Sequence, residues 1–187
     1  MIVGYEGTRA AVNAKQNAVR TALTEMGGTA LGADAGDSWA AGRFDAPYLR
    51  DSLQDVGILV ETLETATFWS NRERLYEAVK AALVEQLGDN TIVLCHISHV
   101  YATGCSLYFT VAAAGGEDPL ARWLPAKAAA SRAIGEAGAA ITHHHAVGTD
   151  HRPYLDAEIG HVGVQILRAI KTAVDPEGIL NPGVLIP

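Results

Sequence analysis

Apolar and polar residues alternate along three stretches of the chain, and a period of two is typical of β-strands. The first predicted strand is ILVETLETATF, Ile58–Phe68, which is rich in β-branched residues. The segments TIVLCHISHVY and GCSLYFTVAAA, residues 91–101 and 104–114, predict two further strands. They are joined through Ala102–Thr103–Gly104, so we expect a hairpin.

Apolar residues that recur every three or four positions predict four helices. Capping residues indicate where helices begin, because their side-chain oxygens accept hydrogen bonds from free backbone N–H groups. Glu73, three residues after Ser70, completes a predicted capping box. The helices are expected to begin after Thr8, after Ser70, at Asp118–Pro119 and near Leu155, and to end at Gly27–Gly28, Gly88, about Gly138 and Asp175–Pro176.

Four segments have weaker patterns. We expect short strands at Ile2–Tyr5 and at residues 141–147, irregular structure over residues 30–57, and an extended tail at residues 179–187. Strands and helices then interleave as β-α-loop-β-α-β-β-α-β-α. This order predicts an α+β fold with a ferredoxin-like antiparallel sheet and helices packed on one face.

Composition narrows the class of protein. A chain of 187 residues that is 49% hydrophobic can bury the core of one domain. The net charge of −7 argues against nucleic acid or an anionic membrane as a partner, and no apolar run has the length of a membrane span. Cys95 and Cys105 fit no zinc or redox motif, so we expect reduced thiols and a cytoplasmic location.

Three of the seven histidines stand together in ITHHHAVG, as His143, His144 and His145. They are candidates for metal ligands, catalytic groups or a packed polar patch. On a regular strand His143 and His145 share one face and His144 points to the other, so the three cannot bind one ion. Packing explains any single histidine as well as function does, but three adjacent titratable rings favour a functional site.

Tyr108 lies on the polar side of its predicted strand, because Leu107 and Phe109 alternate with it. A tyrosine in such a place most often packs against the sheet through its ring. A catalytic phenol needs a nearby cation or imidazole. The histidine segment supplies one if the two segments are neighbours in the sheet.

Arg50, in YLRD, is a candidate anion ligand, because a guanidinium group binds phosphate or carboxylate with two parallel hydrogen bonds. A salt bridge to Asp51 or Asp55 is the simpler alternative. The chain contains neither a glycine-rich dinucleotide fingerprint nor a P-loop. If the protein uses a nucleotide cofactor, its main binding fold is therefore not in this sequence.

Several motifs occur together in one order, and in combination they are specific. They are YLRD, VETLETATFW, CSLYFT, HHHAVG and VDPEGILNPG. Together they resemble the C-terminal, substrate-binding (cap) domain of the FAD-linked oxidases of the vanillyl-alcohol-oxidase superfamily. Within it the chain looks most like the alkyldihydroxyacetonephosphate synthases, the flavoenzymes of ether-lipid synthesis, and their bacterial relatives. The similarity covers nearly all of residues 1–187.

The resemblance implies specific roles. Tyr108 would be the acid/base that removes a proton from the substrate carbon beside the acyl ester. His143, His144 and His145 would line the flavin and substrate site and assist proton transfer. In these synthases a fatty alcohol replaces an acyl group through a flavin–substrate adduct, with no net redox change, so the phenol acts as base and the flavin as electron sink.

The resemblance also implies partners for this domain. Arg50 would hold the phosphate of a phosphorylated, lipid-like substrate, and Asn181 would lie with His144 near the flavin. FAD would be bound mainly by a separate N-terminal domain that is absent from residues 1–187, so we expect this chain alone to be inactive. Its flavin-facing surface would be exposed, which favours association into a homodimer.

The terminal ILNPG is more like the 2-hydroxyacid dehydrogenases of the same superfamily. Those enzymes bind a divalent metal through two histidines of one strand and a Glu-His pair. Here Tyr108 stands where the second strand histidine would be and His144 where the glutamate would be, so we expect no metal. Two alternatives to the synthase remain: an FAD-dependent 2-hydroxyacid or alcohol dehydrogenase or oxidase, and a non-catalytic α+β binding module.

Overall fold

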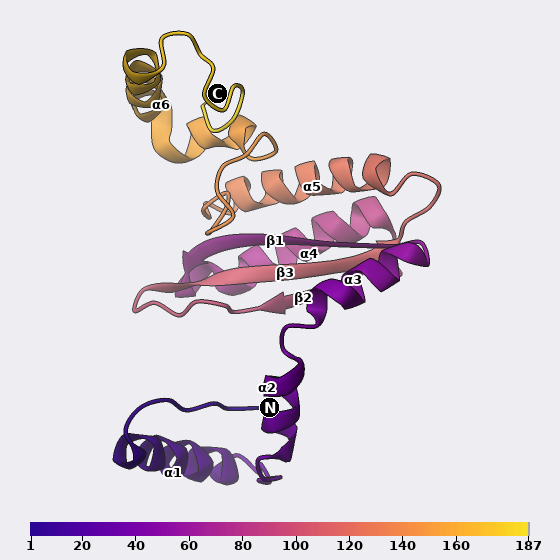
Figure 1. Ribbon diagram of the computed structural model, residues 1–187, viewed down its shortest axis with the longest axis vertical. Helices are drawn as coiled ribbons and strands as arrows, with labels where there is room; N and C mark the ends of the chain where they lie inside the picture. Colours follow the sequence, from indigo (N-terminus) through magenta and orange to yellow (C-terminus); the bar gives the residue numbers. More distant parts are fainter. Residues whose placement is uncertain (187) are drawn as a thin grey trace. The chain divides into compact units, whose positions relative to one another are not determined.

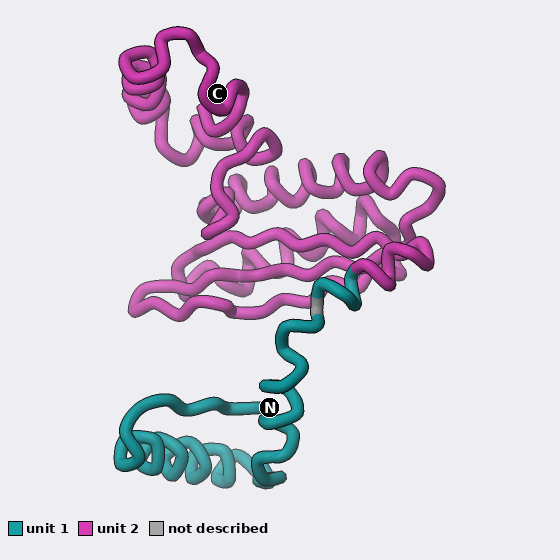
Figure 2. The backbone as a smooth tube through the Cα atoms, viewed as in Figure 1, with its two compact units in different colours: residues 1–50 teal, residues 51–187 magenta. Residues whose placement is uncertain are grey.

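The computed structural model describes residues 1–186, apart from the side chain of Ala46. It divides the chain into two compact units, residues 1–50 and residues 51–187 (Figure 2). Among the described residues, no helix is both long enough and apolar enough to cross a membrane. The sheet and the histidine segment belong to the second unit.

The first unit is helical. It contains α1 (Arg9–Glu25), α2 (Asp34–Gly42) and the first half of α3 (Ala46–Asp55). The side chain of Thr8 accepts a hydrogen bond from the Ala11 N–H at 3.4 Å, which confirms the predicted N-cap of α1.

Two predictions for the first unit are wrong. Ile2–Tyr5 forms no strand: the described part of this unit has no other strand, and a β-strand needs a hydrogen-bonded neighbour. Residues 30–57 are not irregular, because they contain α2 and α3. The carboxylates of Asp34 and Asp37 lie in the first turn of α2, where they interact favourably with the positive end of the helix dipole.

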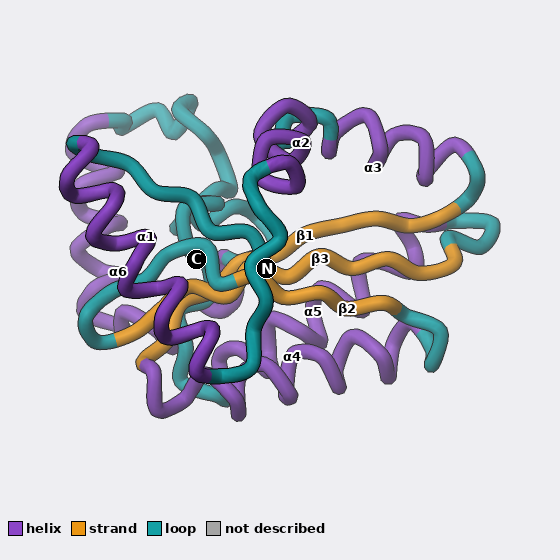
Figure 3. Tube along the Cα trace, turned by 90° about the horizontal axis from the view of Figure 1, so that it is seen from below, coloured by secondary structure: helices purple, strands orange, loops and turns teal. Residues whose placement is uncertain are grey.

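The second unit is a three-stranded antiparallel sheet with two helices against one face (Figure 1). The strands are β1 (Ile58–Phe68), β2 (Ile92–His96) and β3 (Gly104–Ala114), in the order β1-β3-β2. Helices α4 (Arg72–Leu87) and α5 (Pro119–Glu136) lie side by side on the same side of the sheet (Figure 3). The predicted α+β class is confirmed, as are the strand pairing and the helical face.

The core fills the space between the sheet and these helices. Side chains of alternate strand residues, such as Leu63, Leu107 and Phe109, are buried there against Leu75 and Val79 of α4. Complete burial of a side chain such as Phe109 stabilises the fold by roughly 1.5–3 kcal/mol. The other alternate set of residues, which includes Glu64, Ser106 and Tyr108, faces away from the helices. We call this side of the sheet the open face.

The histidine segment lies where a ferredoxin-like fold has its fourth strand. The order β1-α4-β2-β3-α5 requires a last strand beside β1. Here only one bridge forms, Ala66 with Ala140, followed by a hydrogen bond from the His143 N–H to the Glu64 carbonyl at 3.2 Å. The predicted strand at residues 141–147 is therefore wrong. The backbone takes left-handed φ angles of 59° at His144 and 62° at Ala146, which an extended strand cannot contain.

β2 continues into a bulged hairpin. The ladder pairs His96 with Tyr108, and a further bridge pairs Val100 with Cys105. Between these two pairs, three residues (97–99) stand opposite two (106–107), so the β2 side carries one extra residue. The turn at Ala102–Thr103–Gly104 is confirmed, because the Tyr101 N–H bonds the Gly104 carbonyl at 2.8 Å. Both cysteines are free thiols, as expected.

α4 does not begin as predicted. Ser70 lies within a short 3-10 helix (Trp69–Asn71), and α4 starts after Asn71, which makes no side-chain cap. The Asn71 amide instead donates to the Thr67 hydroxyl and to the Ala137 carbonyl, both at 2.9 Å. Asn71 thus ties the end of β1 to the end of α5, and the predicted capping box does not form.

The C-terminal segment turns back on the last helix. After a 3-10 turn (Arg152–Tyr154), α6 spans Leu155–Val174, the predicted bounds, but it is not one continuous helix: Gly160 has a non-helical φ of 76° and kinks it. The buried carboxylate of Asp175 accepts hydrogen bonds from the N–H groups of Ile179 and Leu180, both at 3.0 Å. The tail is therefore a series of turns fastened to the helix end, and the predicted extended conformation is wrong.

Candidate active site on the open face of the sheet

Tyr108 occupies the centre of the open face. In the register of the sheet it lies between Glu64 of β1 and His96 of β2. Its strand neighbours Leu107 and Phe109 are buried on the helical face. The prediction that Tyr108 lies on the polar side of its strand is confirmed.

Glu64 is the buried centre of this site. Only 5% of the residue is exposed, and Ser98 donates a hydrogen bond to Oε1. His143 Nδ1 lies 3.4 Å from Oε1, and His145 Nε2 lies 3.5 Å from Oε2. His99 Nδ1 is farther away, at 3.8 Å. One carboxylate therefore meets side chains from two loops, the bulge after β2 and the histidine segment.

Glu64 is held in its charged form. Burial by itself raises the pKa of this carboxyl group, but the hydroxyls of Ser98 and Ser106 and the imidazole of His143 lower it further than burial raises it. The pKa of Glu64 lies below its usual value of 4.5 as a result. The site thus contains a buried negative charge at neutral pH, surrounded by imidazole rings.

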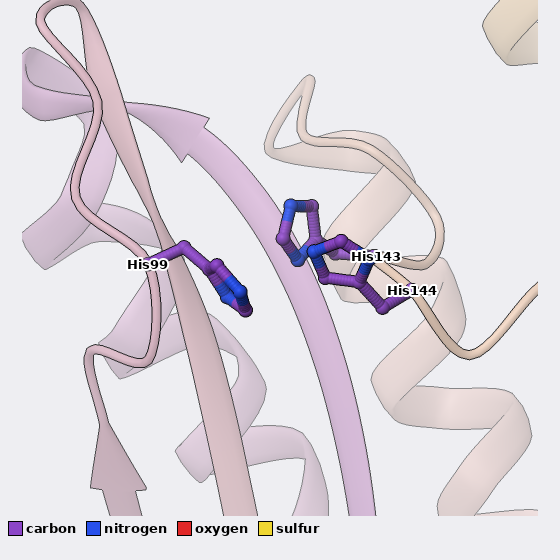
Figure 4. A group of neighbouring side chains, drawn as sticks. All are labelled: His99, His143 and His144. Carbon is purple, nitrogen blue, oxygen red and sulfur yellow. The ribbon is translucent and has the colours of Figure 1, made fainter.

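The three histidines of the triplet divide differently from the prediction. His143 and His144 lie together with ring centroids 4.1 Å apart, and the ring of His99 is 4.5 Å from that of His144 (Figure 4). His145 approaches the same Glu64 carboxylate as His143, and its ring lies edge-to-face against Tyr108 at 5.6 Å. The expectation that His143 and His145 lie on one side is met. The expectation that His144 points to the opposite side is wrong, because its ring lies against that of His143 and a left-handed φ turns the backbone at His144.

Nitrogen atoms of His99, His143 and His144 all lie within 4.8 Å of one another, a spacing that could hold a metal ion. His143, however, has neighbours at both ring nitrogens. Its Nδ1 faces Glu64, and its Nε2 lies 3.0 Å from the Tyr101 hydroxyl. An ion bound to Nε2 would have to displace Tyr101.

The histidine segment is fastened at its far end by His151. Its Nδ1–H donates to the Ala146 carbonyl at 3.2 Å. Burial lowers the pKa of His151, and the nearby ammonium group of Lys127 lowers it further. His151 is therefore a neutral fastening group for the loop that carries His145.

The structure places the two remaining candidates elsewhere in the chain. Arg50 lies on α3, at the end of the first unit, and its role as a phosphate ligand stays a prediction. Asn181 lies in the C-terminal turns with a left-handed φ of 48°, and its carbonyl accepts a hydrogen bond from the Val184 N–H. Within residues 1–186 no hydrogen bond joins Asn181 to the histidines, and its position near a flavin also stays a prediction.

Sequence reasoning missed Glu64, Ser98 and Ser106. The alternation of VETLETATF could have assigned Glu64 to the face opposite Leu63. Nothing in the sequence shows that the histidine segment crosses β1 at this residue. Ser98 and His99 reach the same face because of the bulge, and a one-residue insertion leaves no mark in a hydrophobic pattern.

Comparison with known proteins gives a family for this arrangement. The family model described as "FAD linked oxidases, C-terminal domain" matches residues 1–185. The chain belongs to this family. Its relatives in the FAD-linked oxidase C-terminal family include both a synthase and an oxidase subunit.

Alkyldihydroxyacetonephosphate synthase of Trypanosoma brucei brucei is 32% identical over all of this chain, which spans 31% of that protein. A solved structure of alkyldihydroxyacetonephosphate synthase is similar to this chain, with a TM-score of 0.64 and 27% sequence identity. The match covers 95% of this chain and 30% of the synthase chain. Glycolate oxidase subunit GlcD of Bacillus subtilis (strain 168) is 44% identical over 48 residues, which is 26% of this chain and 10% of that protein.

Proposed function

We propose that this chain is the substrate-facing domain of an FAD-dependent enzyme that resembles alkyldihydroxyacetonephosphate synthase and exchanges an acyl group for a fatty alcohol. The observation that carries the proposal is the contact of Tyr108 with His145 above the buried carboxylate of Glu64. A phenol beside an imidazole is a group that can remove and return a proton. Similarity to that synthase over the whole chain supports the choice of reaction.

In this proposal Tyr108 removes the proton from the substrate carbon beside the ester, and His145 is the adjacent group that takes up the phenolic proton. His143 and His144 line the neighbouring wall of the site. The residues fit a flavin partner, because the exposed rings of His99 and Tyr101 lie within 10° of parallel and offer aromatic faces to a planar ring system. FAD, when bound, would supply the electron sink for the carbon that loses the proton.

An apolar hollow beside the site suits a lipid-like substrate. It has a volume of about 310 Å³, and it is lined by Phe68, Tyr101, Gly104 and Ala140 among others. Tyr101 also contacts His143, so the hollow and the histidines share a wall. A hydrocarbon chain would lie against these residues while its oxygen-bearing end reaches the imidazoles.

The remaining parts of the proposal concern the whole protein. FAD would be held mainly by a separate domain, since this chain covers about a third of the synthase it matches. Arg50 would bind the phosphate group of the substrate and Asn181 would approach the flavin with His144. We propose a cytoplasmic enzyme that assembles as a homodimer, and we expect residues 1–187 alone to be inactive.

A second candidate is an FAD-dependent dehydrogenase or oxidase of 2-hydroxy acids. The local match to glycolate oxidase subunit GlcD favours it. The test compares two reactions of the protein prepared with its FAD-binding domain. With acyl-dihydroxyacetone phosphate and a fatty alcohol we expect an alkyl product and no reduction of an acceptor dye. Reduction of the dye by D-2-hydroxy acids, without alkyl product, would replace the synthase proposal with the second candidate.

A further inference from the structure

Glu64 meets two neighbouring histidines through different ring nitrogens. Its Oε1 lies 3.4 Å from Nδ1 of His143, and its Oε2 lies 3.5 Å from Nε2 of His145. His143 Nδ1 is buried and makes no hydrogen bond, and the Glu64 carboxylate oxygen 3.4 Å away is the acceptor that faces it. A buried N–H group without an acceptor costs about 1–3 kcal/mol, so the carboxylate oxygen in front of it determines whether this nitrogen carries the proton.

The contact on the opposite side of the His143 ring also places the proton on Nδ1. A neutral imidazole has one N–H donor and one acceptor nitrogen, and an ionised carboxylate only accepts. With the proton on Nδ1 facing Glu64, Nε2 is the acceptor. The Tyr101 hydroxyl, 3.0 Å from Nε2, then donates to it. The Nδ1–H form points a donor at the carboxylate and an acceptor at the Tyr101 hydroxyl, and the other neutral form points a lone pair at the carboxylate.

His145 has the reverse arrangement. Its Nε2 faces Oε2 of Glu64, so the proton of the neutral ring belongs on Nε2. The lone pair is then on Nδ1, in the ring that packs edge-to-face against Tyr108. Two residues apart in the sequence, the two histidines would be opposite tautomers.

We propose that Glu64 is the positioning residue of this site: it holds His143 as the Nδ1–H tautomer and His145 as the Nε2–H tautomer. It thereby leaves Nδ1 of His145 as the nitrogen able to accept a proton. Only this last consequence rests on the proposed function. The tautomers themselves are properties of the chain and can be measured without substrate or flavin.

Other groups around Glu64 support this arrangement and do not compete with it. Ser98 donates to Oε1, and its hydroxyl also lies 2.5 Å from that of Ser106. Ser106 in turn accepts a hydrogen bond from the His99 N–H at 2.9 Å. These contacts fix the carboxylate against the bulge, so that one oxygen faces His143 and the other faces His145.

The test is long-range ¹H–¹⁵N NMR of the histidine rings in the ¹⁵N-labelled chain, at a pH where the rings are neutral. The ¹⁵N shifts and couplings distinguish the two tautomers. We expect an Nδ1–H pattern for His143 and an Nε2–H pattern for His145. An Nε2–H pattern for His143 in the unmodified protein overturns the proposal without any variant.

Glu64→Gln provides the second measurement. A glutamine side chain has one acceptor oxygen, so it can accept from only one of the two histidines. At least one of the two patterns should be lost, whereas Glu73→Gln, an exposed carboxylate on α4, should leave both unchanged. Retention of both patterns in a folded Glu64→Gln protein would refute the role of Glu64.

The two proposals fail separately. If the tautomers are as expected but the complete enzyme shows no synthase activity, the positioning role stands and the proposed reaction does not. If alkyl product forms while the tautomers differ from those expected, the reaction stands and Glu64 has only a structural role.

Discussion

The rings of Tyr108 and His145 meet edge-to-face with their centroids 5.6 Å apart, although one residue lies in the central strand and the other in an irregular loop. The loop reaches the strand because the His143 N–H bonds the carbonyl of Glu64, the register partner of Tyr108. β1 therefore holds the histidine loop beside Tyr108. The distance between the phenol and the imidazole depends on how β1 and β3 are aligned in the sheet.

Replacing Tyr108 with phenylalanine should reduce the activity of the complete enzyme by about 10²–10⁴-fold, the usual contribution of a general acid or base. The fold should remain intact, because the ring still packs beside His145. The measurement is the rate of alkyl product formation, with circular dichroism to confirm folding. Tyr76→Phe is the matched control, since Tyr76 stacks on Phe109 in the core and lies away from the site. Full activity of Tyr108→Phe would remove the assigned base.

Acid should destabilise the protein through Glu64. Its pKa is lowered in the folded state, so it contributes stability above its unfolded value of 4.5, and this contribution is lost as the pH falls through the folded-state pKa. Asp175, with a pKa lowered chiefly by the hydrogen bond from Lys171, adds a loss in the same direction below 3.8. Urea unfolding at a series of pH values measures the sum.

The Glu64→Gln variant distinguishes the contribution of Glu64 to acid sensitivity from that of Asp175. It should be less stable than the unmodified protein at neutral pH by about 1.5–3 kcal/mol, as expected for lost hydrogen bonds to a charged group. Its stability should also fall less on acidification, because the contribution of Glu64 is gone while that of Asp175 remains. An acid dependence equal to that of the unmodified protein would show that Glu64 does not carry the effect.

The purified protein should contain no stoichiometric zinc. Both ring nitrogens of His143 face protein partners, so a metal at the His99–His143–His144 group would have to break the contact with Tyr101 or the contact with Glu64. Elemental analysis and the thermal unfolding midpoint with and without a chelator test this, and neither should reveal a bound ion. One zinc per chain that disappears in His99→Ala would contradict the expectation.

Gly104 should tolerate no side chain. A Cβ at this position would lie 2.1 Å from the Thr67 carbonyl oxygen of β1, so the strands would have to separate. We expect Gly104→Ala to destabilise the protein by about 1–3 kcal/mol or more, as overpacking does. Gly135→Ala in α5 is the control: it meets nothing within 4 Å, and it should stabilise the helix by up to about 1 kcal/mol. Equal unfolding midpoints for the two variants would contradict this account.

The regular parts of the fold could be predicted because local physics determines them. The alternation in Ile58–Phe68 gives β1 with the bounds expected, and Asp118 caps α5 through the Ala121 N–H. Tyr108 was assigned to the correct face by the same period of two. In each case the pattern and the tertiary structure require the same conformation.

The rest depends on contacts between distant segments. Asn71 takes the capping position of α4 while its amide is bound to Thr67 and Ala137, which no local rule anticipates. The segment at residues 141–147 has the composition of a strand, but it makes only one bridge and then turns at His144. The burial of Glu64 follows from that turn, and for this reason the sequence predicted the histidines but missed the carboxylate beneath them.

The bulge at residues 97–99 has a consequence for how this domain diverges. A regular ladder could present only one of Ser98 and His99 to the open face, whereas the extra residue lets both reach the Glu64 carboxylate. Loss of a single codon here would restore the regular ladder and withdraw either Ser98 or His99 from Glu64. Descendants of one domain could in this way change the donors around this carboxylate in one step.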